Sequence, residues 1–124
     1  MSQVFFIDDE DDLRIANQQT LELAGIDVTC FADAESALLQ LETETPLAII
    51  TDIRLPGISG HELLVKLIEK DPSLPIILIT GHGDISLAVQ AMHDGAYDFI
   101  EKPFASARLT DSVKRAIEKR MLTE

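Results

Sequence analysis

The stretch LAIITDIRLPGISG (residues 47–60) joins an apolar run to an acid and then to turn residues. Its first five residues are apolar or β-branched in succession, which is typical of a strand buried on both faces of a sheet. The run ends at Asp52, and the proline and glycines that follow mark a loop. Ser59 with Glu62 has the form of a capping box. The stretch therefore predicts a strand, a loop and a helix, with a carboxylate where the strand ends.

The same order recurs along the chain. Further strands are expected at Val4–Ile7, Asp27–Phe31, Pro75–Thr80 and Tyr97–Glu101, and the segments after each carry apolar residues at helical spacing. Asp33 is expected to cap the second helix. Five strand-then-helix units in 124 residues predict a single α/β domain, with a parallel sheet covered by helices on both faces.

The amino-acid composition limits the classes of partner that this protein can bind directly. The 22 acidic and 10 basic residues give a net charge of −12, which repels nucleic acids and anionic lipid. One cysteine, Cys30, excludes an internal disulfide and favours a reducing compartment. The first residues do not resemble a signal peptide, and no apolar run approaches the ~18 residues that span a bilayer. We expect a cytoplasmic protein with neither nucleic acid nor membrane as a direct partner.

Polar residues stand where the predicted strands end: Asp8 and Asp9 after the first, Asp52 after the third, Thr80 after the fourth and Lys102 after the fifth. In a parallel sheet these ends share one edge, where open α/β sheets place their sites. Crowded carboxylates repel one another unless a cation lies among them, and their hard oxygens suit Mg²⁺. A lysine adds a point charge for an oxyanion. The set predicts a Mg²⁺ site for phosphoryl chemistry, in which a carboxylate can attack phosphorus.

The motifs that carry these residues resemble a known family. They are the acidic pair in FIDDE, Asp52 in IITDIRLPGISG, Thr80 in ILITGHGD, and Lys102-Pro103 in DFIEKPF. In this order they are similar to the receiver domain of two-component response regulators, over essentially the whole chain, residues 1–124. The resemblance implies a flavodoxin-like (βα)5 fold, a doubly wound sheet of five parallel strands in the order 2-1-3-4-5.

The resemblance also implies a division of labour among the acids. Asp52 would accept a phosphoryl group from a sensor histidine kinase, with no small-molecule substrate other than phosphodonors. Asp9 and Asp52 would bind Mg²⁺ directly, together with the backbone carbonyl of Arg54, while Asp8 would act largely through water. Residues expected to flank the phosphoryl group are Arg54, Gly81 and His82.

Further residues would turn phosphorylation into a signal. By the same resemblance, Lys102 contacts the carboxylate or a phosphoryl oxygen, and Thr80 moves to hydrogen-bond the phosphoryl group. Phe99 would then turn inward. Many receivers have tyrosine at this position, so a switch that needs its hydroxyl cannot operate here. The bond before Pro103 is a candidate cis peptide, since proline makes that isomer accessible.

A narrower likeness concerns the output. The stretch ITGHGD…AVQAMHDGAYDFIEKPF is similar to receivers of σ54-dependent AAA+ transcription activators of the NtrC type, and DLRIANQQTLELAG adds similarity to regulators of C4-dicarboxylate transport. GHGD and FIEKPF also occur in nitrogen-fixation regulators with a helix-turn-helix output, so that alternative stays open. AAA+ and DNA-binding domains would lie outside these residues, and we expect a piece of a longer regulator rather than a stand-alone receiver.

In the family, a face formed by the fourth helix, the fifth strand and the last helix often carries dimerisation, so a homodimer is expected. The fourth helix contributes Ile85, Ala88 and Met92. Candidate charges across the dimer are Asp98, Arg108, Lys114 and Arg115.

Two other functions are alternatives to the signalling switch. An aspartate-nucleophile phosphatase would need a second acid two residues after Asp52, where Arg54 stands. A flavodoxin-type cofactor binder would need a Ser/Thr/Gly-rich loop after the first strand, where the sequence has DDEDD. We therefore expect a switch and not an enzyme. His61 and His93 are expected to be surface residues without partner ligands, and Cys30 a small buried hydrophobe.

Overall fold

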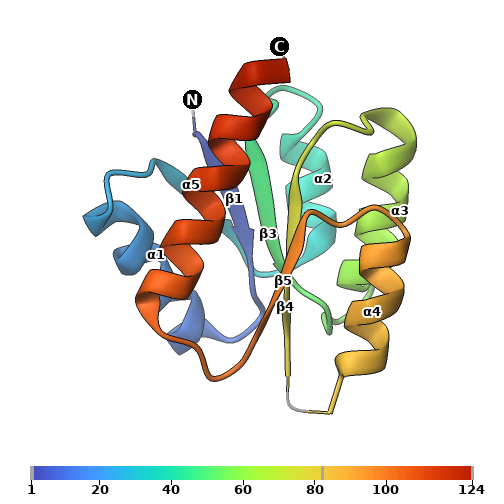
Figure 1. Ribbon diagram of the computed structural model, residues 1–124, viewed down its shortest axis with the longest axis horizontal. Helices are drawn as coiled ribbons and strands as arrows, with labels where there is room; N and C mark the ends of the chain where they lie inside the picture. Colours follow the sequence, from blue (N-terminus) through green and yellow to red (C-terminus); the bar gives the residue numbers. More distant parts are fainter. Residues whose placement is uncertain (1, 82, 124) are drawn as a thin grey trace.

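The computed structural model describes residues 2–81 and 83–123, in which five strands alternate with five helices (Figure 1). The elements are β1 Val4–Ile7, α1 Asp11–Leu23, β2 Val28–Phe31, α2 Ala34–Gln40, β3 Ala48–Asp52, α3 Gly60–Lys70, β4 Ile76–Thr80, α4 Ile85–His93, β5 Asp98–Glu101 and α5 Ser106–Thr123. All strand pairs are parallel, and the order is β2-β1-β3-β4-β5. The predicted fold and strand order are confirmed.

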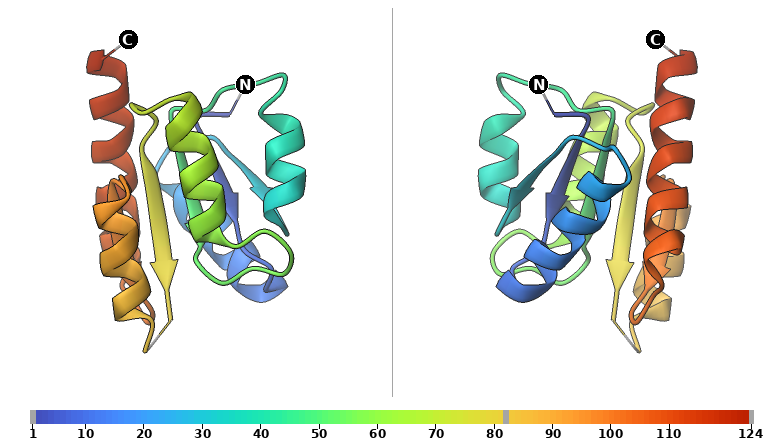
Figure 2. Two further views of the ribbon diagram at one scale, coloured as in Figure 1. Left: turned by 90° about the vertical axis from the view of Figure 1, so that its right-hand side faces the viewer. Right: turned by 90° about the vertical axis from the view of Figure 1, so that its left-hand side faces the viewer.

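Successive side chains of each central strand enter two different cores. Phe5 and Ile7 of β1 pack in the layer with α2, α3 and α4, whereas Val4 and Phe6 pack in the layer with α1 and α5. Figure 1 shows the sheet between these two helix layers, and the two views in Figure 2 look onto the layer with α2, α3 and α4 and onto the layer with α1 and α5. Because each face of the sheet is covered, β1, β3 and β4 are buried at every position, which explains their uninterrupted apolar runs.

Local signals in the sequence set the helix starts. Asp33 accepts a hydrogen bond from the backbone N–H of Ser36 at 2.7 Å, so the expected cap of α2 is confirmed. Ser59 likewise accepts from the N–H of Glu62 at 3.1 Å at the start of α3. These two caps fix where α2 and α3 leave the loops beside the carboxyl edge of the sheet.

One expectation about a single residue is wrong, and one polar contact between helices was not expected. Cys30 is half-buried rather than buried, because β2 lies at the edge of the sheet and all four of its residues are partly exposed. The unexpected contact is made by His61, whose Nε2 lies 2.7 Å from Oδ2 of Asp94 and so joins α3 to the end of α4. Such a pair joins residues 33 positions apart, so helical spacing gives no sign of it.

The face proposed for dimerisation already uses part of its charge within the chain. Arg108 donates to Asp98 at 2.9 Å and to the carbonyl of Phe99 at 2.9 Å. Ser112 also donates to Asp98, at 2.8 Å. Asp98 and Arg108 therefore join β5 to α5, and contacts across a dimer would have to compete with this pair.

In the part of the chain that the structure describes, no helix combines the length and apolar character needed to cross a bilayer.

Candidate functional site

The polar residues that follow the strands meet at the carboxyl edge of the sheet. Asp52 is the last residue of β3 and pairs in register with Ile79, one residue before Thr80 ends β4. Thr80 pairs in turn with Glu101, the residue before Lys102. The parallel register thus brings side chains that are up to about a hundred residues apart in sequence to one level of the sheet.

Three carboxylates form a cluster at this edge. Asp8, Asp9 and Asp52 each offer an oxygen, and these atoms all lie within 4.8 Å of one another. Asp8 and Asp52 are buried, whereas Asp9 is exposed. The loop after β1 is held by Asp8 itself, whose Oδ1 accepts from the N–H of Glu10 at 2.9 Å and whose carbonyl accepts from Arg14 at 2.8 Å.

The environment of the second carboxylate oxygen of Asp8 indicates a cation site. Asp8 Oδ2 is buried and has no hydrogen-bond partner among the described residues. Desolvation raises the pKa of Asp8 above its usual value, and the hydrogen bond from Glu10 and the charge of Lys102 offset this only in part. A buried, unpaired carboxylate oxygen beside two other acids fits a hard divalent cation such as Mg²⁺.

Lys102 lies against the acid at the centre of the cluster. Its Nζ is 2.7 Å from Oδ2 of Asp52. Burial alone would lower the pKa of Lys102, but the hydrogen bond and charge of Asp52, with further charge from Asp8 and Glu10, outweigh burial and raise it. Lys102 is therefore a fixed ammonium at neutral pH. The peptide bond from Lys102 to Pro103 is cis.

The other oxygen of Asp52 is also held. Its Oδ1 accepts from the backbone N–H of Arg54 at 3.1 Å, so both oxygens of this carboxylate are oriented. Gly60, the first residue of α3, allows the helix to approach: a Cβ there would overlap the carbonyl oxygen of Asp52. The sequence places Gly60 in a turn but does not reveal this contact, since its backbone needs no positive φ.

Thr80 and Phe99, the two residues predicted to act as a switch, lie on the neighbouring strands β4 and β5. Thr80 is buried, and its Oγ1 has no hydrogen-bond partner within residues 2–81 and 83–123. Phe99 is half-buried and packs against the core beneath α2, α3 and α4. Gly81, which follows Thr80, is partly exposed and lines the cleft. His82 lies outside the described residues.

The side chain of Arg54 makes a contact that the sequence did not predict. Its Nε donates to Oδ2 of Asp84 at 2.9 Å, and its Nη2 donates to Oδ1 at 2.7 Å. Hydrogen bonding to Arg54 holds the pKa of Asp84 below its usual range. An acid directly before a helix is typical of an N-cap. The position of Asp84 before Ile85 therefore indicates capping and gives no sign of a pair with Arg54.

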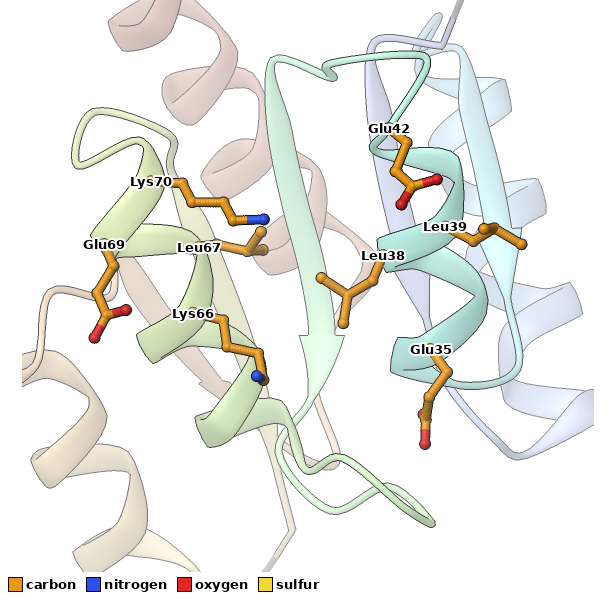
Figure 3. Close-up of a pocket in the computed structure, with 8 residues that line it drawn as sticks. All are labelled: Glu35, Leu38, Leu39, Glu42, Lys66, Leu67, Glu69 and Lys70. Carbon is orange, nitrogen blue, oxygen red and sulfur yellow. The ribbon is translucent and has the colours of Figure 1, made fainter.

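These groups surround an open cleft of about 610 Å³ at the carboxyl edge, lined by Asp9, Glu10, Asp52, Arg54, Gly81, Asp84, Lys102 and Pro103. A second hollow of about 430 Å³ lies between α2 and α3, where Leu38 and Leu67 point toward one another (Figure 3). It shares no lining residue with the cleft, and its charged walls are formed by Glu35 and Glu42, in and just after α2, and by Lys66, Glu69 and Lys70 of α3. The clustered acids and Lys102 make the cleft the candidate functional site.

Comparison with known proteins agrees with this geometry. Residues 4–114 match the response regulator receiver domain family. The chain is 58% identical, over 119 residues, to the C4-dicarboxylate transport transcriptional regulatory protein DctD of Rhizobium meliloti, covering 96% of this chain and 26% of that protein. It is 41% identical to the transcriptional regulatory protein FixJ of Bradyrhizobium diazoefficiens, covering 92% of this chain and 56% of FixJ.

Solved structures give the same picture. A response regulator receiver domain protein from Clostridium thermocellum superposes with a TM-score of 0.93 at 28% identity and full coverage of both chains. NtrX from Brucella abortus superposes with a TM-score of 0.91 at 38% identity, covering 98% of this chain and 28% of NtrX. The chain thus spans about a quarter of the length of the DctD and NtrX proteins that it matches.

Proposed function

Since the chain belongs to the response regulator receiver domain family, a signalling domain of two-component systems, we propose that Asp52 is its phosphoacceptor. One observation carries the proposal: Asp52 is a buried acid that binds the lysine, lies within 4.8 Å of the neighbouring acidic oxygens and lines the open cleft. Its phosphodonor is a phosphohistidine on a sensor kinase.

Transfer to Asp52 balances without a further reactant. An oxygen of the Asp52 carboxylate attacks phosphorus, the P–O bond forms, and the P–N bond of the phosphohistidine breaks with its electron pair left on the imidazole nitrogen. Lys102, fixed as an ammonium 2.7 Å from Asp52, stabilises the negative charge that gathers on the phosphoryl oxygens. The N–H of Arg54 keeps the carboxylate oriented during the attack.

The acidic cluster is proposed as a Mg²⁺ site. Asp9 and Asp52, with the backbone carbonyl of Arg54, would hold the ion directly, and Asp8 would act largely through water. The support is the unpaired buried oxygen of Asp8 and the spacing of the three acids. A bound Mg²⁺ supplies charge neutralisation between the acids and the incoming phosphoryl group.

Thr80 and Phe99 are proposed to convert phosphorylation into a conformational signal. The buried hydroxyl of Thr80 has a donor to offer and no partner among the described residues, which suits a hydrogen bond to a phosphoryl oxygen. Movement of Thr80 would open space for Phe99 to turn inward. Phenylalanine has no hydroxyl, so the signal from this pair is one of packing alone.

The output is proposed to be σ54-dependent transcription activation, with a helix-turn-helix output of the FixJ type as the alternative. Similarity to DctD over 96% of this chain supports the first, and similarity to FixJ keeps the second. A homodimer through α4, β5 and α5 is supported by apolar residues left exposed on α4. These are Ile85, Leu87, Val89 and Met92.

Phosphate counting separates a switch from an enzyme. The protein is incubated with Mg²⁺ and acetyl phosphate, and inorganic phosphate release and protein-bound phosphoryl groups are measured in wild type and Asp52→Asn. A switch takes up one phosphoryl group per chain, depends on Mg²⁺, and loses the uptake in the variant. Sustained release of many equivalents per minute would instead support a phosphatase, and FMN absorbance in the purified protein would support the flavodoxin-type reading.

A further inference from the structure

A chain of contacts connects the proposed phosphoacceptor to the start of α4 by a route separate from Thr80 and Phe99. Asp52 Oδ1 accepts from the backbone N–H of Arg54, and the guanidinium of the same residue binds both carboxylate oxygens of Asp84. Asp84 is the residue directly before α4. Arg54 alone therefore connects Asp52 to the residue that precedes α4.

Asp84 stands at the N-cap position of α4 but does not cap the helix. Its side chain makes no capping hydrogen bond, although aspartate is among the best N-cap residues. Both oxygens are instead taken by Arg54, and the side chain is only 10% exposed. The start of α4 is therefore tied to the loop after β3, and a cap that the sequence provides is not used.

Packing alone holds α4 weakly, which makes this tie consequential. The helix buries Ala88 and Ala91 as its only buried residues within the described chain, and both side chains are small. Its other end is tied to α3 by the pair of His61 and Asp94 at 2.7 Å. A short helix that buries little apolar area is among the least stable parts of a fold, so a single polar contact can determine its position.

We propose that Asp84 is a positioning residue that holds the Arg54 guanidinium and keeps α4 in its resting place, and that a phosphoryl group on Asp52 takes over Arg54 and releases α4. The inference rests on the proposed function of Asp52 and adds a second path by which the site controls the α4 surface.

The charges favour this exchange of partners. Arg54 and Asp84 both line the cleft beside Asp52, so a phosphoryl group there brings strong acceptor oxygens close to the guanidinium. The phosphoryl group also adds negative charge near Asp84, which weakens the binding of the Asp84 carboxylate to the Arg54 guanidinium. Once released, Asp84 can accept from the first backbone N–H groups of α4, so the helix gains a cap in the released position.

The test is two-dimensional ¹H–¹⁵N NMR on wild type, Asp84→Asn and Arg54→Gln, each without and with beryllofluoride and Mg²⁺. Beryllofluoride serves as the phosphoryl mimic. In the unmodified variants, the α4 amide signals should move along the line that joins the resting and beryllofluoride-bound signals of wild type. We expect the population of the released arrangement to rise roughly twofold to fivefold, the range for one solvent-accessible ion pair. The Nε–H signal of Arg54 should change when wild type binds beryllofluoride.

Asp94→Asn is the matched control. It breaks the tie to His61 at the other end of α4, by the same change of side chain, but has no contact with Arg54. Its α4 signals should move off that line, and its response to beryllofluoride should remain. If Asp84→Asn leaves α4 at the wild-type resting positions, or if the Arg54 Nε–H signal does not respond to beryllofluoride, the proposal is overturned.

Failure of the proposed function gives a different result. Wild type would then show no Mg²⁺-dependent beryllofluoride signals anywhere in the cleft, and control of α4 by a phosphoryl group would be refuted with it. The contact between Arg54 and Asp84 is still tested by the spectra recorded without beryllofluoride. It stands if Asp84→Asn changes the Arg54 Nε–H signal, and it is wrong if the signal is the same in both.

Discussion

Replacing Asp8 with asparagine removes one of three crowded charges while keeping the hydrogen-bonding shape of the side chain. The acidic oxygens lie within 4.8 Å of one another, and at an effective dielectric constant near 20 one pair at that distance costs about 3.5 kcal/mol. Attraction between Asp8 and Lys102 offsets much of this, and solvent screens exposed Asp9. We expect Asp8→Asn to raise the free energy of unfolding by about 1–2 kcal/mol without Mg²⁺.

The pH dependence follows from the direction of the pKa shift. Burial raises the pKa of Asp8, so the folded protein binds this proton more readily than the unfolded chain does. The ionised carboxylate therefore destabilises wild type at neutral pH, and this penalty fades as pH falls through the folded pKa. The stability advantage of Asp8→Asn should shrink on acidification.

Urea unfolding with and without Mg²⁺ measures both effects. Wild type should gain about 1.4 kcal/mol when Mg²⁺ is tenfold above its Kd, and Asp8→Asn should gain clearly less. Asp12→Asn is the control, because Asp12 is an exposed acid of the same segment outside the cluster. Equal stability of wild type and Asp8→Asn without Mg²⁺, or an equal gain with it, would refute the cation site built on Asp8.

Three further results are expected. Gly60→Ala should lower the free energy of unfolding by about 1–3 kcal/mol in urea titrations, because its Cβ would overlap the carbonyl of Asp52; wild-type stability would contradict the close approach. Burial raises the pKa of Cys30 to about 11, so its alkylation by iodoacetamide at pH 8 should be more than tenfold slower than that of a model thiol; an equal rate would show that the thiol is not shielded. The hydrogen bond from Arg120 lowers the pKa of Asp71 below its usual value. Wild type should therefore be more stable than Asp71→Asn at neutral pH and should lose that advantage as pH falls through the lowered pKa. A constant difference in urea midpoints from pH 6 to 3 would contradict this.

The sequence predicted which polar residues meet at one edge of the sheet, because each of them follows a buried strand. Continuous apolar runs identify the buried strands, and a parallel sheet brings their ends to one edge, so Asp52 and Lys102 could be expected to meet from pattern alone. That Lys102 lies 2.7 Å from Asp52 needed the structure, but their proximity did not.

Contacts between surface segments escaped prediction for a physical reason. The pairs Arg54–Asp84 and His61–Asp94 each join residues that are 30 or more positions apart, across loops and helix ends. Hydrophobic periodicity reports which face of an element is buried, not which polar groups on two neighbouring elements pair. Cys30 was misjudged similarly, because strand pattern does not say which strand lies at the edge.

The most direct test of the central claim is to locate the phosphoryl group. After incubation with Mg²⁺ and acetyl phosphate, intact mass spectrometry should show one added phosphoryl group per chain, and peptide mapping should assign it to Asp52. The increase should vanish in Asp52→Asn or when Mg²⁺ is chelated, and persist in Asp12→Asn. A phosphoryl group found on another residue, or one that remains in Asp52→Asn, would contradict the account.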